Sequence, residues 1–142
     1  MAELMKTGAL EYKAHKAKPT HPTELVRQIQ KGLPFSQLQA LRRQLDLPLD
    51  ELASKLSISR ATLHRRKNAG RLSPDESDKL MRFSRLLEHA ANVFGSLEKG
   101  RAWLKFPQYG LGGAVPLNYA ETEIGAREVD NLLGRIDYDV YS

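Results

Sequence analysis

Residues 49–68, LDELASKLSISRATLHRRKN, hold the densest set of side chains in this chain that could bind a polyanion. No acidic residue occurs between Glu51 and Asp75, whereas six basic residues do: Lys55, Arg60, Arg65, Arg66, Lys67 and Arg71. Clustered cations of this kind bind phosphates, with an affinity that falls steeply with salt. Arginine and asparagine also read guanine and adenine edges in the major groove. The pattern predicts binding to double-stranded DNA, with a solvated basic helix face as the alternative.

Two short helices joined by a turn would position these side chains. Ala53 is the small residue required where two helices cross steeply. Four apolar residues are spaced to fill the space between the helices: Leu52, Leu56, Ile58 and Leu63. This spacing predicts a helix-turn-helix, a motif that often has glycine where Ser57 stands and an apolar residue where Arg66 stands. Arg66 can still lay its aliphatic stem on the core.

The second helix of such a motif enters the major groove with its N-terminal end first. We therefore expect Arg60 and Arg65 to contact bases. Phosphate contacts are expected from Lys55, Arg66, Lys67 and Arg71. The other candidate DNA-binding positions on this helix are Ser59, Thr62, His64 and Asn68.

Helical patterns also precede and follow this segment. Pro22 and Gly32 bracket a helix, and Ser36 with Gln39 forms a capping box before the stripe Leu38, Leu41 and Leu45. Residues 73–76, SPDE, cap a long helix that reaches about Phe94 and presents one apolar face. Ser59 and Gly70 bracket the predicted DNA-binding helix.

The last third of the chain predicts two further helices around a glycine-rich loop. Ser96 begins a short helix that carries Trp103 and stops before Pro107. We interpret Trp103 as a core residue or a domain-interface anchor. The loop QYGLGGAVPL lacks the pattern of a phosphate-binding loop. Thr122 caps a final helix that Gly134 ends. The tail DYDVYS is expected to be exposed, and the alternative is a short pair of strands near it.

Composition bounds the remaining possibilities. The chain has 142 residues, a net charge of +5 and no cysteine, which excludes disulfides and thiolate chemistry. Residues 1–105 hold 20 of the 22 Lys/Arg and 11 of the 17 Asp/Glu, a net charge of +9. The last 37 residues hold the other 2 Lys/Arg and the other 6 Asp/Glu, which gives a net charge of −4. This division indicates two partners, an anionic one for the body and a basic one for the tail, with an unevenly charged solvated surface as the alternative.

Several classes of protein find no support in the sequence. No apolar run approaches a membrane span, and we expect a cytoplasmic protein without membrane contact. The four histidines are scattered, so we expect no metal, and no catalytic residues, cofactor or small-molecule substrate are predicted.

We expect an all-α chain with a helix-turn-helix bundle joined by a long helix to a second small helical domain. Residues 1–18 are predicted to be a disordered basic arm, 19–72 the helix-turn-helix domain, and 73–142 the second domain with its tail.

The residues of both parts resemble a known family. Residues 20–90, with ISRATLHRRK and LSPDESDKL, resemble the Xre-type antitoxins of bacterial toxin–antitoxin pairs. Residues 78–142 resemble the MbcA/ParS/Xre toxin-binding domain through an ordered set of positions: Phe94-Gly95, Glu98-Lys99-Gly100, Trp103-Leu104, Pro107, Leu111-Gly112-Gly113, Pro116, Thr122, Gly125, Val129 and Leu133-Gly134-Arg135-Ile136. Asp139 departs from the glycine that often follows the tyrosine.

The resemblance implies an antitoxin that blocks a RES-domain toxin, an enzyme that degrades NAD, and that represses its own operon as a homodimer on operator DNA. A toxin that holds a pyrophosphate offers positive groups, which an acidic tail can pair with. We therefore expect toxin contacts from Arg135, Asp137, Tyr138, Asp139, Val140, Tyr141 and Ser142. A frayed terminus is the alternative for the tail, and a stand-alone dimeric transcription regulator is the alternative for the whole chain.

Overall fold

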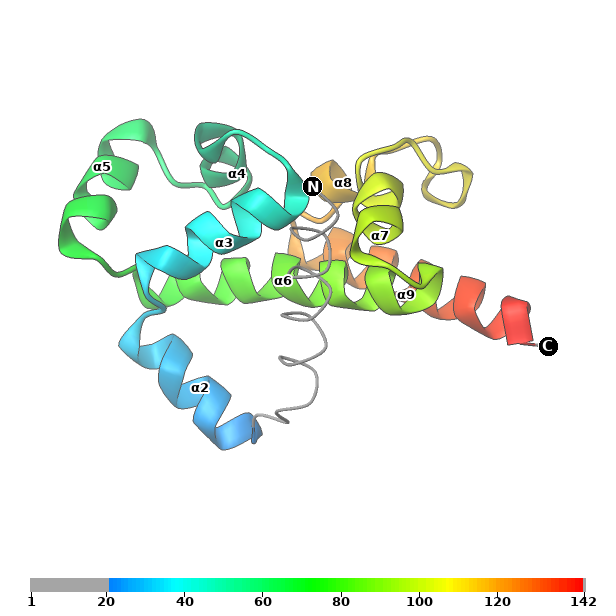
Figure 1. Cartoon of the computed structure of the whole chain (residues 1–142), viewed down its shortest axis with the longest axis horizontal. Coiled ribbons are helices and arrows are strands. Elements are labelled where there is room, and N and C mark those ends of the chain that lie inside the picture. The colour runs from blue at the N-terminus through cyan, green and yellow to red at the C-terminus, as the bar shows by residue number, and fades with distance from the viewer. Residues whose placement is uncertain (1–20, 142) are drawn as a thin grey trace. The chain divides into compact units, whose positions relative to one another are not determined.

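The computed structural model describes residues 21–141, and it describes side chains as far as residue 138. Within these residues the chain forms eight α-helices and one 3-10 helix (Figure 1). An isolated bridge between Pro34 and Arg71 is the one β-type pairing in this part of the chain. The prediction of an all-α fold is confirmed. The predicted basic arm, residues 1–18, lies outside the described residues.

The described residues divide into two compact units, 21–81 and 82–141, and the division falls inside one long helix, α6 (Pro74–Phe94).

None of the helices in residues 21–141 is both long enough and apolar enough to cross a bilayer.

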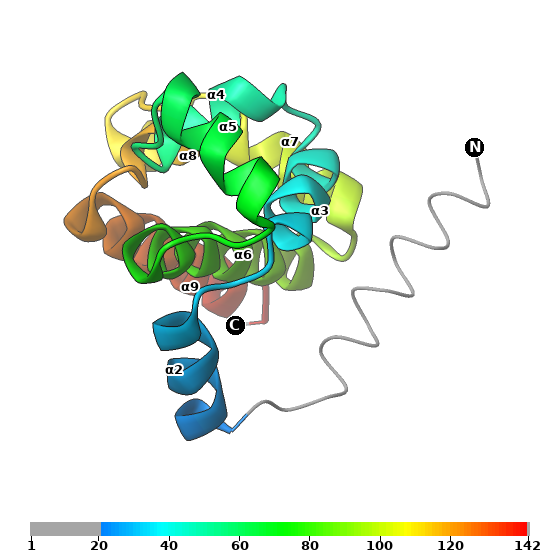
Figure 2. The same cartoon turned by 90° about the vertical axis from the view of Figure 1, so that its left-hand side faces the viewer.

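The first unit contains α2 (Pro22–Lys31), α3 (Phe35–Leu45), α4 (Leu49–Lys55), α5 (Arg60–Ala69) and the start of α6. Helices α3, α4 and α5 lie together, whereas α2 projects away from them (Figures 1 and 2). The predicted leucine stripe of α3 is confirmed, because it is buried with leucines of α4 and its C-cap: Leu38, Leu41, Leu45, Leu52 and Leu56.

Hydrogen bonds join the segment before α3 to the segment after α5 and to α6. The Phe35 N–H donates to the Gly70 carbonyl at 2.9 Å, and the Leu72 N–H donates to the Leu33 carbonyl at 2.9 Å. The Leu33 N–H also donates to the buried Ser77 hydroxyl at 2.7 Å. The segments that precede α3 and follow α5 are thereby joined to each other and to α6.

The predicted cap at Ser36 is wrong. Helix α3 begins at Phe35, two residues before the start that a Ser36 cap implies, and its N-cap is Pro34, which makes no side-chain cap bond. The Phe35 N–H, one of the first N–H groups that have no partner within the helix, is bound by the distant Gly70 carbonyl. A tertiary hydrogen bond thus replaces the local one that the sequence pattern indicates.

The other predicted helix starts are confirmed. Pro22 lies in the first turn of α2, and Gly32 follows that helix with φ at 92°. At the start of α6, the Glu76 N–H donates to the Ser73 hydroxyl at 3.2 Å. The Ser73 N–H donates to the Glu76 carboxylate at 2.9 Å, which completes the capping box.

The second unit contains the rest of α6, α7 (Leu97–Leu104), η1 (Tyr109–Leu111), α8 (Pro116–Tyr119) and α9 (Glu123–Tyr141). Its core includes Phe83, Leu104, Leu117, Val129 and Leu133. Helix α7 approaches α6 so closely that a β-carbon on Gly100 would lie 2.6 Å from the Ala91 nitrogen. The interpretation of Trp103 as a packing residue agrees with its tilted contact with Phe94, at 5.6 Å between ring centroids.

The predicted end of the last helix at Gly134 is wrong. Helix α9 continues through Gly134 to Tyr141, so the residues expected to form an exposed tail or a short strand pair are helical as far as Tyr141. Gly134 has no positive φ, and the apolar stripe continues across it from buried Leu133 to half-buried Ile136. Continued burial on one face outweighs the stop signal of a single glycine.

Candidate functional site

Helices α4 and α5 meet at a tight turn that has the predicted helix-turn-helix geometry. Ala53 is buried at the crossing, and the Ile58 N–H donates to its carbonyl at 2.8 Å. Ser57 has φ at 60°, in the left-handed region that favours glycine. The turn therefore keeps the backbone that related motifs build with glycine, even though this chain has serine there.

Helix α5 is exposed along much of its length, because seven of its ten residues are exposed and none is fully buried, although Leu63 is half-buried. Thr62 is also half-buried. The remaining candidate DNA-binding positions at the cap and on the helix are exposed: Ser59, Arg60, His64, Arg65, Lys67 and Asn68. The structure thus places six of the ten predicted DNA-binding residues together on one accessible element.

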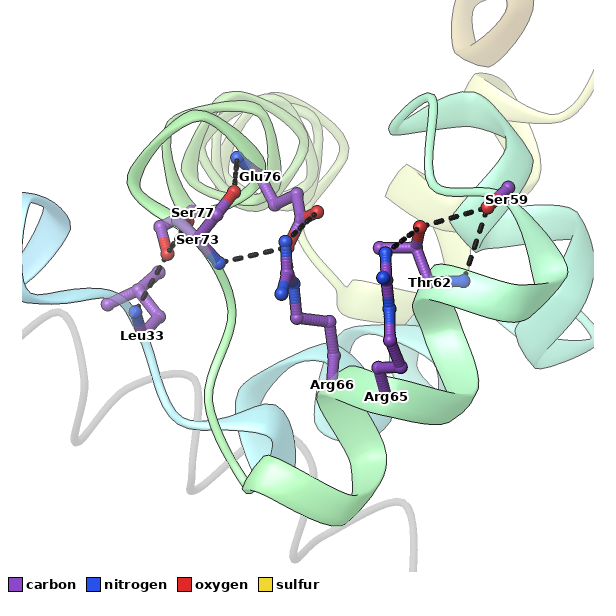
Figure 3. A network of polar contacts seen from close by, with 8 residues as sticks. All are labelled: Leu33, Ser59, Thr62, Arg65, Arg66, Ser73, Glu76 and Ser77. Atoms are coloured by element: carbon purple, nitrogen blue, oxygen red, sulfur yellow. Dashed lines mark hydrogen bonds and ion pairs between the residues drawn. The ribbon is translucent and has the colours of Figure 1, made fainter.

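A short chain of hydrogen bonds orients the N-terminal end of α5 (Figure 3). The Thr62 N–H donates to the Ser59 hydroxyl at 3.2 Å, which confirms Ser59 as the N-cap. The Ser59 hydroxyl donates to Thr62 Oγ1 at 3.0 Å, and Arg65 donates to the same oxygen at 3.0 Å. Arg65 remains exposed, so its guanidinium is held in place and keeps further donors for a ligand.

Arg66 has a different partner and reaches Glu76 at the start of α6 (Figure 3). Its Nε donates to one Glu76 oxygen at 2.8 Å and a terminal nitrogen donates to the other at 3.2 Å, which makes a bidentate ion pair. The Glu76 side chain is only 13% exposed. The same carboxylate caps α6 through Ser73, so one glutamate connects α5 to the start of α6.

The ion pair changes the acidity of both partners. Burial by itself raises the pKa of Glu76, but the hydrogen bonds from Arg66 and Ser73 lower it more, so its pKa lies below that of an ordinary glutamate. The hydrogen bond to Glu76 raises the pKa of Arg66. Both groups are therefore charged at neutral pH.

The two remaining predicted phosphate contacts lie at the margins of this surface. Lys55, at the end of α4, is half-buried and has an interaction partner within the chain. Arg71, after α5, is exposed and donates to the Gly32 carbonyl. The Arg60 side chain is 90% exposed, and its contact with Asp50 is long, at 4.0 Å.

The second candidate surface lies on α9 in the second unit. Arg135 and Tyr138 line an open groove of about 690 Å³ together with Asn131, Asp130 and His89. His89 Nδ1 lies 2.6 Å from the Asp130 carboxylate, a contact that connects α6 and α9. Of the other predicted toxin contacts, Asp137 is half-buried. The side chains of Asp139, Val140, Tyr141 and Ser142 lie outside the described part of the structure.

Two exposed aromatic residues of this unit were missed by the sequence analysis. Phe106 is 67% exposed and Tyr109 is fully exposed, and both lie in the segment between α7 and α8. The available signal was two aromatic residues in a glycine-rich segment without apolar periodicity, where no helical core position accounts for them.

Family models match the two halves of the chain. Residues 24–85 match the Xre-like helix-turn-helix domain of antitoxins. Residues 89–138 match the C-terminal toxin-binding domain of the Xre, MbcA and ParS antitoxins. The helix-turn-helix geometry of α4 and α5 falls in the first match, and the groove and the exposed aromatic residues fall in the second.

Three curated relatives are each named Antitoxin Xre. The chain is 36% identical over 123 residues to Antitoxin Xre of Yersinia enterocolitica, covering 84% of this chain and 82% of that protein. It is 40% identical over 74 residues to Antitoxin Xre of Photorhabdus laumondii, covering 51% and 50%, and 28% identical over 114 residues to that of Pseudomonas putida, covering 80% and 63%. The chain therefore belongs to the Xre antitoxin family, with a helix-turn-helix domain followed by a C-terminal toxin-binding domain.

Proposed function

We propose that this antitoxin neutralises a RES-domain toxin that degrades NAD, and that it binds the promoter of its own operon and represses it. It acts in the cytoplasm as a homodimer and by binding alone, without catalysis or a cofactor. The observation that carries the proposal is an exposed basic helix on a helix-turn-helix, in the same chain as a toxin-binding domain.

The DNA contacts follow from the two faces of α5. Arg60 begins the helix at the end that enters the groove, Arg65 lies near its middle, and both are exposed; we assign them to bases. Lys67, Lys55 and Arg71 are assigned to phosphates, with Ser59, Thr62, His64 and Asn68 beside them. Since the guanidinium of Arg66 is engaged by Glu76, we assign Arg66 to holding α5 in position.

The toxin contacts follow from the end of α9. Arg135 and Tyr138 are three residues apart and share one side of the helix. The Asp137 carboxylate supplies the charge that can pair with groups meant for a pyrophosphate, and Tyr138 supplies exposed aromatic area. On sequence grounds the proposal also includes Asp139, Val140, Tyr141 and Ser142.

A mixing assay tests the proposed function. A purified RES-domain toxin from the same operon is titrated with the full chain while NAD consumption is followed. Inhibition should be complete near a stoichiometric ratio, and the antitoxin alone should consume no NAD. Unchanged NAD consumption at saturating antitoxin contradicts the proposal.

A further inference from the structure

Two exposed aromatic side chains lie close together in sequence in the segment between α7 and α8. Tyr109 is fully exposed and Phe106, three residues earlier, is 67% exposed. Single exposed apolar residues are ordinary on a protein surface. Two aromatic residues so close in sequence are less ordinary, because rings of this size dominate the energetics of protein interfaces.

Hydrogen bonds hold the backbone that carries these rings. The Gln108 side chain donates to the Trp103 carbonyl at 2.9 Å and to the Phe106 carbonyl at 3.2 Å. The Gln108 N–H donates to the Ala114 carbonyl at 3.0 Å, and the Gly113 N–H donates to the Gln108 carbonyl at 2.9 Å. Gln108 therefore closes the loop from both sides and fixes the residues next to it.

The loop is also anchored to the domain. Leu111, two residues after Tyr109, is buried, and η1 contacts α9. A ring on a backbone that is already ordered loses little conformational entropy when it binds. Phe106 and Tyr109 are thus exposed on an ordered support.

The chemistry of the loop indicates what kind of partner it fits. The loop and the short helix α8 that follows it, residues 106–120, contain no Asp, Glu, Lys, Arg or His, although charged residues are 27% of the chain. A surface without cations cannot neutralise phosphates, which disfavours nucleic acid. Protein interfaces have cores that are depleted of charge and enriched in aromatic residues. The loop also lies within residues 89–138, which match the toxin-binding domain.

We propose that Phe106 and Tyr109 form the main affinity anchor for the toxin, separate from the end of α9. The anchor rests on the proposed function, since the partner is the toxin. It implies a division of work within the domain, in which the loop supplies binding and the end of α9 blocks the active site.

The double variant Phe106→Ser/Tyr109→Ser tests the anchor in the full chain. Both side chains are exposed, so their loss should leave folding intact, which operator binding and thermal melting check. The matched control is Val26→Ser, which removes an apolar side chain 51% exposed on α2. Calorimetric titration against the purified RES-domain toxin should show affinity reduced by at least about 30-fold in the double variant. The control should bind as the wild-type chain does.

The outcomes separate the two proposals. A wild-type chain that does not bind the toxin contradicts the proposed function and the anchor with it. Wild-type binding together with unchanged affinity of the double variant contradicts the anchor alone. Loss of self-association with unchanged toxin affinity, measured by light scattering, assigns the loop to a second copy of the chain and also overturns the anchor.

Discussion

Two adjacent arginines on α5 have different surroundings. Arg65 and Arg66 are adjacent in sequence, yet Arg65 is exposed and bound to Thr62, whereas Arg66 forms a bidentate pair with a nearly buried glutamate. Helix geometry turns consecutive side chains by about 100°. The charge of a residue therefore does not reveal its role until the face on which it lies is known.

Arg65→Ala should lower affinity for the operator by about 1–3 kcal/mol and relax sequence choice, because Arg65 is assigned to a base. Fluorescence anisotropy with operator and scrambled duplexes at one salt concentration measures both effects. Arg27→Ala, on exposed Arg27 of α2, is the matched control and should change neither. An equal loss on both duplexes would make Arg65 a phosphate contact.

Glu76→Gln should destabilise the chain by about 1–3 kcal/mol at neutral pH, because it weakens a charged hydrogen-bond pair. A carboxyl whose folded pKa is lowered adds stability above its ordinary pKa of about 4.3, and that stability is lost as pH falls through the folded pKa. The difference between variant and wild type should therefore shrink on acidification.

Urea denaturation at neutral and acidic pH measures this difference in the free energy of unfolding. Asp75→Asn is the matched control, since Asp75 is an exposed acid in the same first turn of α6. If the difference in free energy of unfolding between Glu76→Gln and wild type stays constant across the pH range, the ion pair is not its cause.

At the scale of elements, caps and stripes predict most of the helices. Ser59, Ser73, Ser96 and Thr122 each accept a hydrogen bond at the helix start that the sequence indicates. The two errors have a common cause. At Ser36 a tertiary hydrogen bond replaced a local cap, and at Gly134 burial on both sides of the glycine continued the helix.

Gly134→Ala distinguishes the continuous helix from the predicted stop. In a helix interior, alanine should raise the free energy of unfolding by about 0.5–1 kcal/mol, and a β-carbon here meets no atom within 4 Å. Helicity by circular dichroism and the denaturation midpoint measure the effect. Destabilisation would indicate a left-handed Gly134 that ends the helix. Gly95→Ala is the control and should destabilise, since Gly95 has φ at 89°.

At the scale of the whole molecule, the chain combines a basic body with an acidic C-terminal part. The net charge is +9 over residues 1–105 and −4 over the last 37. The basic excess includes the exposed face of α5, and the acidic excess lies around α9. We infer from this that DNA and toxin binding use separate surfaces, so their effects should add.

Deletion of residues 137–142 should abolish inhibition of the toxin while leaving operator affinity unchanged. If the anchor on the loop exists, the truncated chain should still bind the toxin, because Phe106 and Tyr109 remain. Calorimetry and the NAD assay on the same samples separate binding from inhibition. Full inhibition by the truncated chain would exclude an active-site block by the end of α9.

The sequence by itself determined what depends on local patterns: the helical class, the helix-turn-helix, the cap residues, the charge division and the family. The helix-turn-helix and the caps rest on neighbours within one or two helical turns, where residue type and spacing decide the energy. That range includes Ala53 at the helix crossing and Ser73 with Glu76 at the start of α6.

Only the tertiary structure decided which of these residues remain available to a partner. The Arg66–Glu76 pair, the Gly70 carbonyl at the start of α3 and the exposure of Phe106 and Tyr109 all depend on the folded arrangement of their units. Burial and hydrogen-bond partners come from residues distant in the chain. Spacing along the sequence cannot specify them, because they exist only once the backbone is folded.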